Sequence, residues 1–322
     1  MSGLRTADLY AFAWRNVRRL PDALVRGGAH LVADVVWALR LSGVRQLQSN
    51  LHRLRPDLDP RELRRCSRAG MRSYLRYFAE AFQLPGWTPE RIAARVRPVG
   101  VERVTRVTDD AGTAVLALGH SGNWDLAGAW AGAHIAPVLT VAEKLPDGLY
   151  EEFLAFRSGL GIEIVPFEKG GGTFRTLVRK ARTGPRIVPL LADRDLSAHG
   201  VEVTIAGHAA RVAAGPAALA STGSHELLPV AIHYERLRGE RRRAAGSPWG
   251  LVVEFLPAIP TRDADGRRRP LDLVTQEWVT ALFDAYARHP EDWHMLQKVF
   301  LSDLDADRLA RQRARASEGA PS

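Results

Sequence analysis

The sequence predicts an α/β protein with a mostly parallel central sheet flanked by helices, and with a helical region at its N-terminus. Three observations predict this class. The run Ala114–Leu118 is apolar without polar alternation, as in a strand buried on both faces of a parallel sheet. Strand and helix candidates alternate after this run, which is typical of parallel βαβ units. Residues 1–95, in contrast, contain helical patterns.

The N-terminal region, residues 1–95, is expected to pack on the core and to associate with a membrane. From Leu4 to Leu20 the apolar side chains share one helical face, and three arginines gather elsewhere: Arg15, Arg18 and Arg19. A basic amphipathic helix of this kind can lie in a membrane interface or simply pack on the protein core. Both alternatives stay open.

A longer helix is predicted to begin after Asp59, an N-cap residue followed by Pro60, and to continue to Leu84. Arginines recur at every fourth position along it, as a cationic stripe: Arg64, Arg68, Arg72 and Arg76. Such a stripe is either a solvated face or a docking surface for anionic lipid.

Residues 96–300 are expected to form the α/β core, and residues 301–322 a C-terminal helix and tail. Further strands are predicted at Val138–Val141, Ile162–Pro166, Arg186–Ala192, Val201–Ala206, Leu227–Tyr234 and Leu251–Leu256. Helices are predicted after Trp124 and near Gly148–Gly159, Thr173–Ala181, Gly215–Ser221 and Leu271–His289. The segment Arg236–Arg243 reads as a basic loop.

The composition limits the classes of function. The chain of 322 residues carries a net charge of +9, and all but four of its 45 cationic residues are arginine. Such a surface attracts phosphates and an anionic membrane surface, while nucleic-acid binding is suggested by charge alone and is not expected. The single cysteine, Cys66, excludes an internal disulfide and fits a reducing compartment. Neither a signal peptide nor a transmembrane helix is predicted.

The best candidate for a catalytic residue is His120, which follows the predicted strand at Ala114–Leu118 after a single glycine. Open α/β sheets bind ligands at the carboxyl ends of their strands. Asp125 lies five residues further on, in the first turn of the next helix, and a carboxylate that orients a histidine makes it a general base. The alternative is that Asp125 only favours the start of the helix.

The same residues suggest a second mechanism. Gly119–Asn123 resembles the G-x-S-x-G turn of serine hydrolases, with Ser121 at the nucleophile position but Asn123 in place of the last glycine. The backbone N–H groups of Ser121, Gly122 and Asn123 are candidate donors to an oxyanion.

Six blocks, in order, identify the chain as similar to a known family: GHSGNWDLAG, AEKL, FRSGLGIEIVP, LLADRDLSAHGVEV, AAGPAALA and HPEDWHMLQKVF. They resemble the actinobacterial phosphatidylinositol mannoside acyltransferases, which belong to the superfamily of the lipid A biosynthesis (lauroyl) acyltransferases. The similarity extends from about residue 8 to about residue 310.

The resemblance implies roles for residues that would otherwise read as surface charges. An acidic residue at the position of Asp193 pairs with the histidine in the family, where a member carries the longer glutamate. Glu143 and Arg157 match positions of the polar acceptor pocket. From its place after the strand Arg186–Ala192, Arg194 is expected at the same sheet edge. Arg211 precedes a short helix whose N-terminus could receive a phosphate.

The function that follows is acyl transfer from acyl-CoA to a mannose hydroxyl of a phosphatidylinositol mannoside, with His120 as general base. No cofactor and no metal are expected, acyl-CoA being a co-substrate. The implied location is peripheral, at the cytoplasmic face of the inner (plasma) membrane. Two alternatives remain: a serine hydrolase or thioesterase that uses Ser121 and His120, and a non-catalytic protein that binds membranes.

Overall fold

The computed structural model describes residues 17, 20–142, 157–167, 172–195 and 200–304. Nearly all of the predicted helix Leu4–Leu20 lies outside these ranges, as do most of the predicted helix near Gly148–Gly159 and the tail beyond residue 304.

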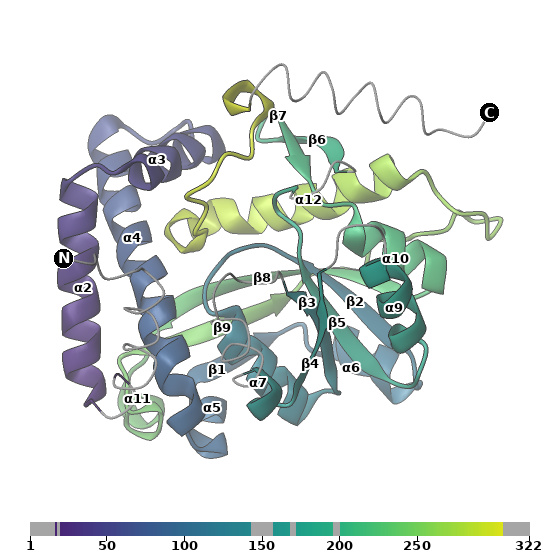
Figure 1. Ribbon diagram of the computed structural model, residues 1–322, viewed down its shortest axis with the longest axis horizontal. Helices are drawn as coiled ribbons and strands as arrows, with labels where there is room; N and C mark the ends of the chain where they lie inside the picture. Colours follow the sequence, from purple (N-terminus) through teal and green to yellow (C-terminus); the bar gives the residue numbers. More distant parts are fainter. Residues whose placement is uncertain (1–16, 18–19, 143–156, 168–171, 196–199, 305–322) are drawn as a thin grey trace, which may run out of the picture.

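The middle layer of the protein is a seven-stranded sheet in the order β1-β9-β8-β2-β5-β3-β4 (Figure 1). The neighbours from β8 to β4 pair in parallel, whereas β9 pairs antiparallel with β8 and parallel with β1. The mostly parallel sheet is therefore confirmed. The strands are β1 Val96–Val99, β2 Thr113–Leu118, β3 Val138–Ala142, β4 Ile162–Pro166, β5 Arg186–Leu191, β8 Glu226–Arg236 and β9 Trp249–Phe255.

Two strands stand outside this sheet. The predicted strand at Val201–Ala206 is β6, Val201–Ile205, and it pairs antiparallel with β7, His208–Val212, in a separate hairpin. The sequence did not predict β7, because its first residues are exposed and lack a continuous apolar pattern.

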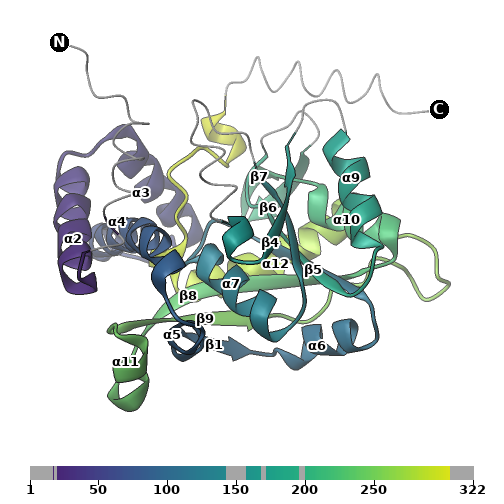
Figure 2. The ribbon, with the colours of Figure 1, turned by 60° about the horizontal axis from the view of Figure 1, so that its bottom comes forward.

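Helices cover both faces of the sheet (Figure 2). Successive residues of a strand point to opposite faces, so β2 contributes Val115 and Ala117 to one core and Leu116 and Leu118 to the other. The first core lies against α9 Gly172–Ala181, α10 Gly215–Gly223 and α12 Leu271–Arg288. The second lies against α5 Pro89–Arg95, α6 Glu102–Asp109 and α7 Trp124–His134.

The N-terminal helices are α2 Asp22–Ala38, α3 Ser42–Leu54 and α4 Pro60–Gln83, which share a small core of their own. The predicted start of α4 is confirmed. The Asp59 side chain accepts from the N–H groups of Arg61 and Glu62, and the Glu62 side chain accepts from the Asp59 N–H, which makes a complete capping box.

Two expectations about basic segments are corrected. The stripe along α4 is not one solvated surface, because Arg68 and Arg72 both pair with Asp34 of α2 at 2.6 Å and Arg76 is buried. The segment expected as a basic loop contains the helix α11, Gly239–Ala245. Its run of good helix formers ends at Gly246, whose left-handed conformation favours a helix C-terminus.

The helices of the described ranges include none that is both long enough and apolar enough to cross a membrane.

Candidate active site

Strand register brings His120 and Asp193 together. Leu118 of β2 pairs with Leu191 of β5 at the carboxyl edge of the sheet. His120 follows two residues after Leu118, and Asp193 follows two residues after Leu191. There the ring nitrogen Nδ1 of His120 lies 2.7 Å from Oδ1 of Asp193. A carboxylate at this position holds a proton on Nδ1 and leaves Nε2 as an acceptor. The His120 side chain keeps about a quarter of its surface exposed (24%), so a substrate can reach it.

The carboxylate of Asp193 is fully buried and accepts three hydrogen bonds. Besides the His120 ring, the backbone N–H of His120 and the indole N–H of Trp293 each donate to Oδ2 at 2.9 Å. Burial alone would raise the pKa of Asp193, but the His120 charge and these hydrogen bonds outweigh it and lower the pKa below its usual range. Asp193 is therefore ionised at neutral pH and can accept the Nδ1 proton of His120.

The turn that carries His120 needs both of its glycines. A Cβ on Gly119 would lie 2.5 Å from the Asp193 carboxylate, so a side chain there would push the carboxylate away. Gly122 has a φ of +57°, and a Cβ on it would meet the Ile232 backbone oxygen at 2.9 Å. These glycines let the histidine backbone approach both Asp193 and β8.

Two of the three predicted oxyanion donors already have acceptors. The N–H of Ser121 donates to the Gly119 carbonyl at 2.8 Å, and the N–H of Gly122 donates to the Asp292 carbonyl at 3.0 Å. Asn123 instead caps α7, its side-chain oxygen accepting from the Leu126 N–H. The prediction of a turn is confirmed. The N–H groups of Ser121 and Gly122 are occupied in this conformation, within the turn and by Asp292, so their assignment as oxyanion donors stays a prediction that these bonds do not favour.

Asp125 is not the partner of His120. Its two carboxylate oxygens accept from the hydroxyl of Tyr77 at 2.9 Å and from Nε of Arg157 at 2.8 Å. The expectation that Asp125 orients the His120 ring is wrong, since the ring nitrogen is taken by Asp193. The shorter side chain of Asp193, compared with the glutamate of the resembled family, is sufficient for this contact.

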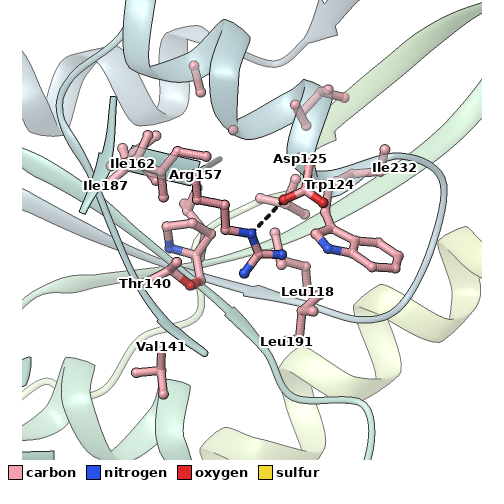
Figure 3. Close-up of a pocket in the computed structure, with 18 of the residues that line it drawn as sticks. Leu118, Trp124, Asp125, Thr140, Val141, Arg157, Ile162, Ile187, Leu191 and Ile232 are labelled. Carbon is pink, nitrogen blue, oxygen red and sulfur yellow. Dashed lines mark hydrogen bonds and ion pairs between the residues drawn. The ribbon is translucent and has the colours of Figure 1, made fainter. Parts of the chain in front are cut away.

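An apolar pocket lies between α7 and one face of the sheet (Figure 3). Leu118 and Leu191, the last residues of the two strands that lead to His120 and Asp193, both line it. Small residues of α7, Ala127, Gly128 and Ala131, leave the space open. Its empty volume, open side included, is about 660 Å³.

The polar part of this pocket is the ion pair between Asp125 and Arg157. In Figure 3 the Arg157 guanidinium lies across the pocket from Thr140 toward Asp125 and Trp124. Both charged residues are more than nine-tenths buried. An acidic and a basic group beside an apolar pocket can orient the polar end of an amphipathic ligand.

The C-terminal motif His289–His294 supports the catalytic residues through hydrogen bonds. Trp293 donates to Asp193, and the N–H of His294 donates to the His120 carbonyl at 2.7 Å. The buried Asp292 side chain accepts from Ser73 Oγ and from the Tyr234 N–H. The sequence offered no means to assign these contacts, because a run such as PEDWH has no periodicity and its partners come from distant segments.

The remaining predicted site residues have different surroundings. Glu143 lies outside the described residues. Arg194 donates to the side-chain oxygen of Gln297, next to the site. Arg211 is buried and pairs through Nε with Asp195 at 3.0 Å, and its expected role in receiving a phosphate at the start of α10 stays a prediction. Asp195 also accepts from the Gly200 N–H at 3.1 Å.

Ser121 does not have the geometry of an activated nucleophile. Its side chain is almost fully buried, and its backbone pairs with Trp293 in an isolated bridge. In the described part of the chain, no hydrogen bond joins Ser121 Oγ to the His120 ring. A nucleophilic serine needs such a contact with its base.

A histidine with a buried carboxylate partner, placed beside an apolar pocket, is a general-base site for a substrate with a long apolar part. The sequence agrees with this class: it matches the model of the bacterial lipid A biosynthesis acyltransferases over residues 4–302. The chain belongs to this family and is an acyltransferase.

Two curated relatives are similar over nearly their whole length. The phosphatidylinositol mannoside acyltransferase of Mycolicibacterium smegmatis is 36% identical over 314 residues, 96% of each chain. The protein of the same name from Mycobacterium tuberculosis is 36% identical over 320 residues, 97% of this chain and 94% of its own.

Among solved structures, the 1-acyl-sn-glycerophosphate acyltransferase PlsC of Thermotoga maritima covers 83% of this chain and 98% of its own, with a TM-score of 0.38 and 14% identity. A likeness of this degree transfers no residue role.

The surroundings of Asp292 predict a pH dependence of stability. Burial raises the pKa of Asp292 from 3.8 to about 6. The folded protein then holds this proton more tightly than the unfolded chain, so the free energy of unfolding falls as pH rises from about 4 to about 6, by of the order of 2 kcal/mol. Asp292→Asn should remove this decline.

The test compares urea unfolding of the wild type and Asp292→Asn at several pH values. Because other carboxyls titrate equally in both proteins, the difference between the two profiles isolates Asp292. Parallel profiles between pH 4 and pH 6 would contradict the prediction.

Proposed function

We propose that this chain transfers a long-chain fatty acyl group from acyl-CoA to a mannose hydroxyl of a phosphatidylinositol mannoside, with His120 as general base. The observation that carries the proposal is the His120–Asp193 pair at the edge of an apolar pocket. The names of the two mycobacterial relatives support the acceptor.

In this mechanism Nε2 of His120 takes the proton of the sugar hydroxyl while the hydroxyl oxygen attacks the thioester carbonyl. The ionised Asp193 stabilises the imidazolium that forms. The tetrahedral intermediate collapses, the bond to sulfur breaks, and the CoA thiolate leaves. A thiolate is a good leaving group, so the scheme requires neither a covalent serine nor a metal.

The apolar pocket is proposed to hold the acyl chain. Its walls are the aliphatic side chains of six strands and the small residues of α7, which suit methylene groups and offer nothing to a sugar. Trp124 lines the pocket and also lies edge-on to the His120 ring, at 5.6 Å between ring centroids. A chain in the pocket would thus present its carbonyl carbon toward His120.

The acceptor is proposed to bind at the polar end of this arrangement. Arg157 and Arg194 supply cationic groups for a phosphate, and Glu143 supplies a carboxylate for sugar hydroxyls. Asp125 already fixes Arg157, so its role is to position the guanidinium rather than to orient the base.

Peripheral association with an anionic membrane surface, at the cytoplasmic face of the inner membrane, completes the proposal. Large apolar side chains are exposed on α2 and at its C-cap, including Leu24, Leu31 and the C-cap residue Leu39, at 65–68%. An exposed apolar helix face on a protein of net charge +9 is suited to an anionic lipid surface.

The general base is tested with His120→Ala and Ser121→Ala, assayed by mass spectrometry with palmitoyl-CoA and phosphatidylinositol mannoside. Loss of the base should lower the rate about 10²–10⁴-fold, whereas Ser121→Ala should stay within a few-fold of the wild type. A product one acyl chain heavier establishes the transfer.

Loss of activity in Ser121→Ala would instead support the serine hydrolase. Free fatty acid without acylated lipid would point to a thioesterase. Full activity in His120→Ala would contradict the proposed base, and a wild type that only binds vesicles would support the non-catalytic alternative.

Two isosteric changes separate the roles of the carboxylates. Asp193→Asn should lower kcat by about 10²-fold or more, because the neutral amide no longer stabilises the imidazolium. Asp125→Asn should mainly raise KM for the acceptor, since Arg157 loses its charged partner. Steady-state kinetics with the acceptor varied will distinguish them; a larger kcat loss for Asp125→Asn would reverse the assignment.

The acyl pocket is tested by filling it. Ala131→Leu adds three carbon atoms to a wall of the pocket. The expected result is a several-fold loss of transfer from palmitoyl-CoA with less loss for a donor shorter by several carbons. Ala136→Leu, also buried but absent from the lining, is the control for general destabilisation. An unchanged chain-length preference in Ala131→Leu would place the acyl chain elsewhere.

A further inference from the structure

A second cavity lies beneath α2, away from the sheet edge that carries His120. Its walls come from α2, α4, the end of α5 and the segment after α11, which adjoin at the lower left of Figure 1. It contains about 310 Å³ of empty space, open side included. Polar and charged side chains line it: Asp22, Arg26, His30, Arg76, Glu80 and Arg95.

The two carboxylates of this cavity already have partners. Glu80 pairs with Arg95 through one oxygen, and its other oxygen accepts from the Tyr234 hydroxyl and the Asn123 side chain, each at 2.9 Å. Asp22 pairs with Arg91. Neither is left to neutralise the remaining cations of the cavity.

Arg76, which lines this cavity, has no anionic partner among the residues that the structure describes. It is only 7% exposed, and its Nε is buried with no hydrogen-bond acceptor. Its guanidinium lies 3.7 Å from the ring centroid of Trp249 and 4.6 Å from that of Tyr234. Aromatic rings offset part of the lost hydration, but they give the buried Nε–H no acceptor. Within the described ranges, no ion pair of Arg76 or of Arg26 is found.

His30 supplies the cavity with a ring nitrogen that can donate a hydrogen bond, not with a charge. Its Nε2 is buried without a partner. Burial lowers the pKa of His30, and the charges of Arg76, Arg72 and Arg26 lower it further. The groups around it thus form a region of positive potential that an anion would neutralise.

We propose that this cavity is a binding site for a phosphate group, held by Arg76 and Arg26 with His30 as a further donor. A phosphate fits better than a carboxylate because its oxygens point in several directions and can accept from donors on different walls. The group can be a free phosphate or the phosphodiester of a lipid headgroup.

The test measures inorganic phosphate binding by calorimetry, and by thermal unfolding in phosphate against chloride at equal ionic strength. Phosphate should raise the Tm of the wild type. Arg76→Met keeps an unbranched apolar side chain beside Trp249 and should weaken phosphate binding about 10- to 100-fold, as expected for lost charged hydrogen bonds. Arg106→Met, the same change at a position 65% exposed, is the control and should bind like the wild type.

A second variant, Arg26→Met, is included in case Arg76→Met impairs folding. Arg26 is only half buried, so its substitution should disturb folding less, and it should also weaken phosphate binding. The proposal is overturned if phosphate gives no shift beyond that of chloride, or if the wild type and both cavity variants respond equally.

Vesicles distinguish the two sources of phosphate. Sedimentation uses phosphatidylcholine vesicles with and without phosphatidylinositol. If Arg76→Met binds the phosphatidylinositol vesicles more weakly than Arg106→Met does, the cavity takes a lipid phosphodiester. If Arg76→Met weakens the binding of inorganic phosphate but leaves vesicle binding equal to that of Arg106→Met, the cavity takes a free phosphate.

Discussion

The burial of one carboxylate, that of Asp193, sets the arrangement of the active site. An ionised carboxylate away from water is stable only when its oxygens are hydrogen-bonded or paired with charge. Asp193 meets this condition with donors from two distant parts of the chain, the turn after β2 and the motif before the C-terminal segment. The close approach of Gly119 and the position of Trp293 are therefore consequences of the same requirement.

Much of the fold could be predicted because its signals are local. The apolar run before His120 is continuous, as a strand buried on both faces requires, and the Asp59–Glu62 capping box is contained in four residues. Segments without such signals were missed: β1 is short, and β7 has two exposed residues at its start. The basic segment around Arg241 was interpreted from its charge, although its residue types favour a helix.

The position of the candidate site could be predicted from the sequence, but the hydrogen bonds and ion pairs between its residues could not. Asp125 and Asp193 are both plausible partners of His120, and the choice depends on the register between β2 and β5, which is a tertiary property. Likewise, a free amide is needed at an oxyanion, and the amides of Ser121 and Gly122 are occupied by a neighbour within the turn and by a residue 170 positions away. The burial of Arg211 against Asp195 is equally invisible in the sequence, where both residues are isolated charges.

The helix α4 explains why these long-range contacts converge. Ser73, Tyr77 and Glu80 follow one another at helical spacing and contact Asp292, Asp125 and Asn123 respectively. One face of α4 therefore supports the C-terminal motif, the partner of Arg157 and the cap of α7. Arg76 lies on the same side of the helix, where it meets aromatic rings instead of a carboxylate. Because Glu80 contacts both Asn123 and Arg95, a charge that enters the cavity beneath α2 acts on the same carboxylate that holds the start of α7, and the two sites are physically connected through it.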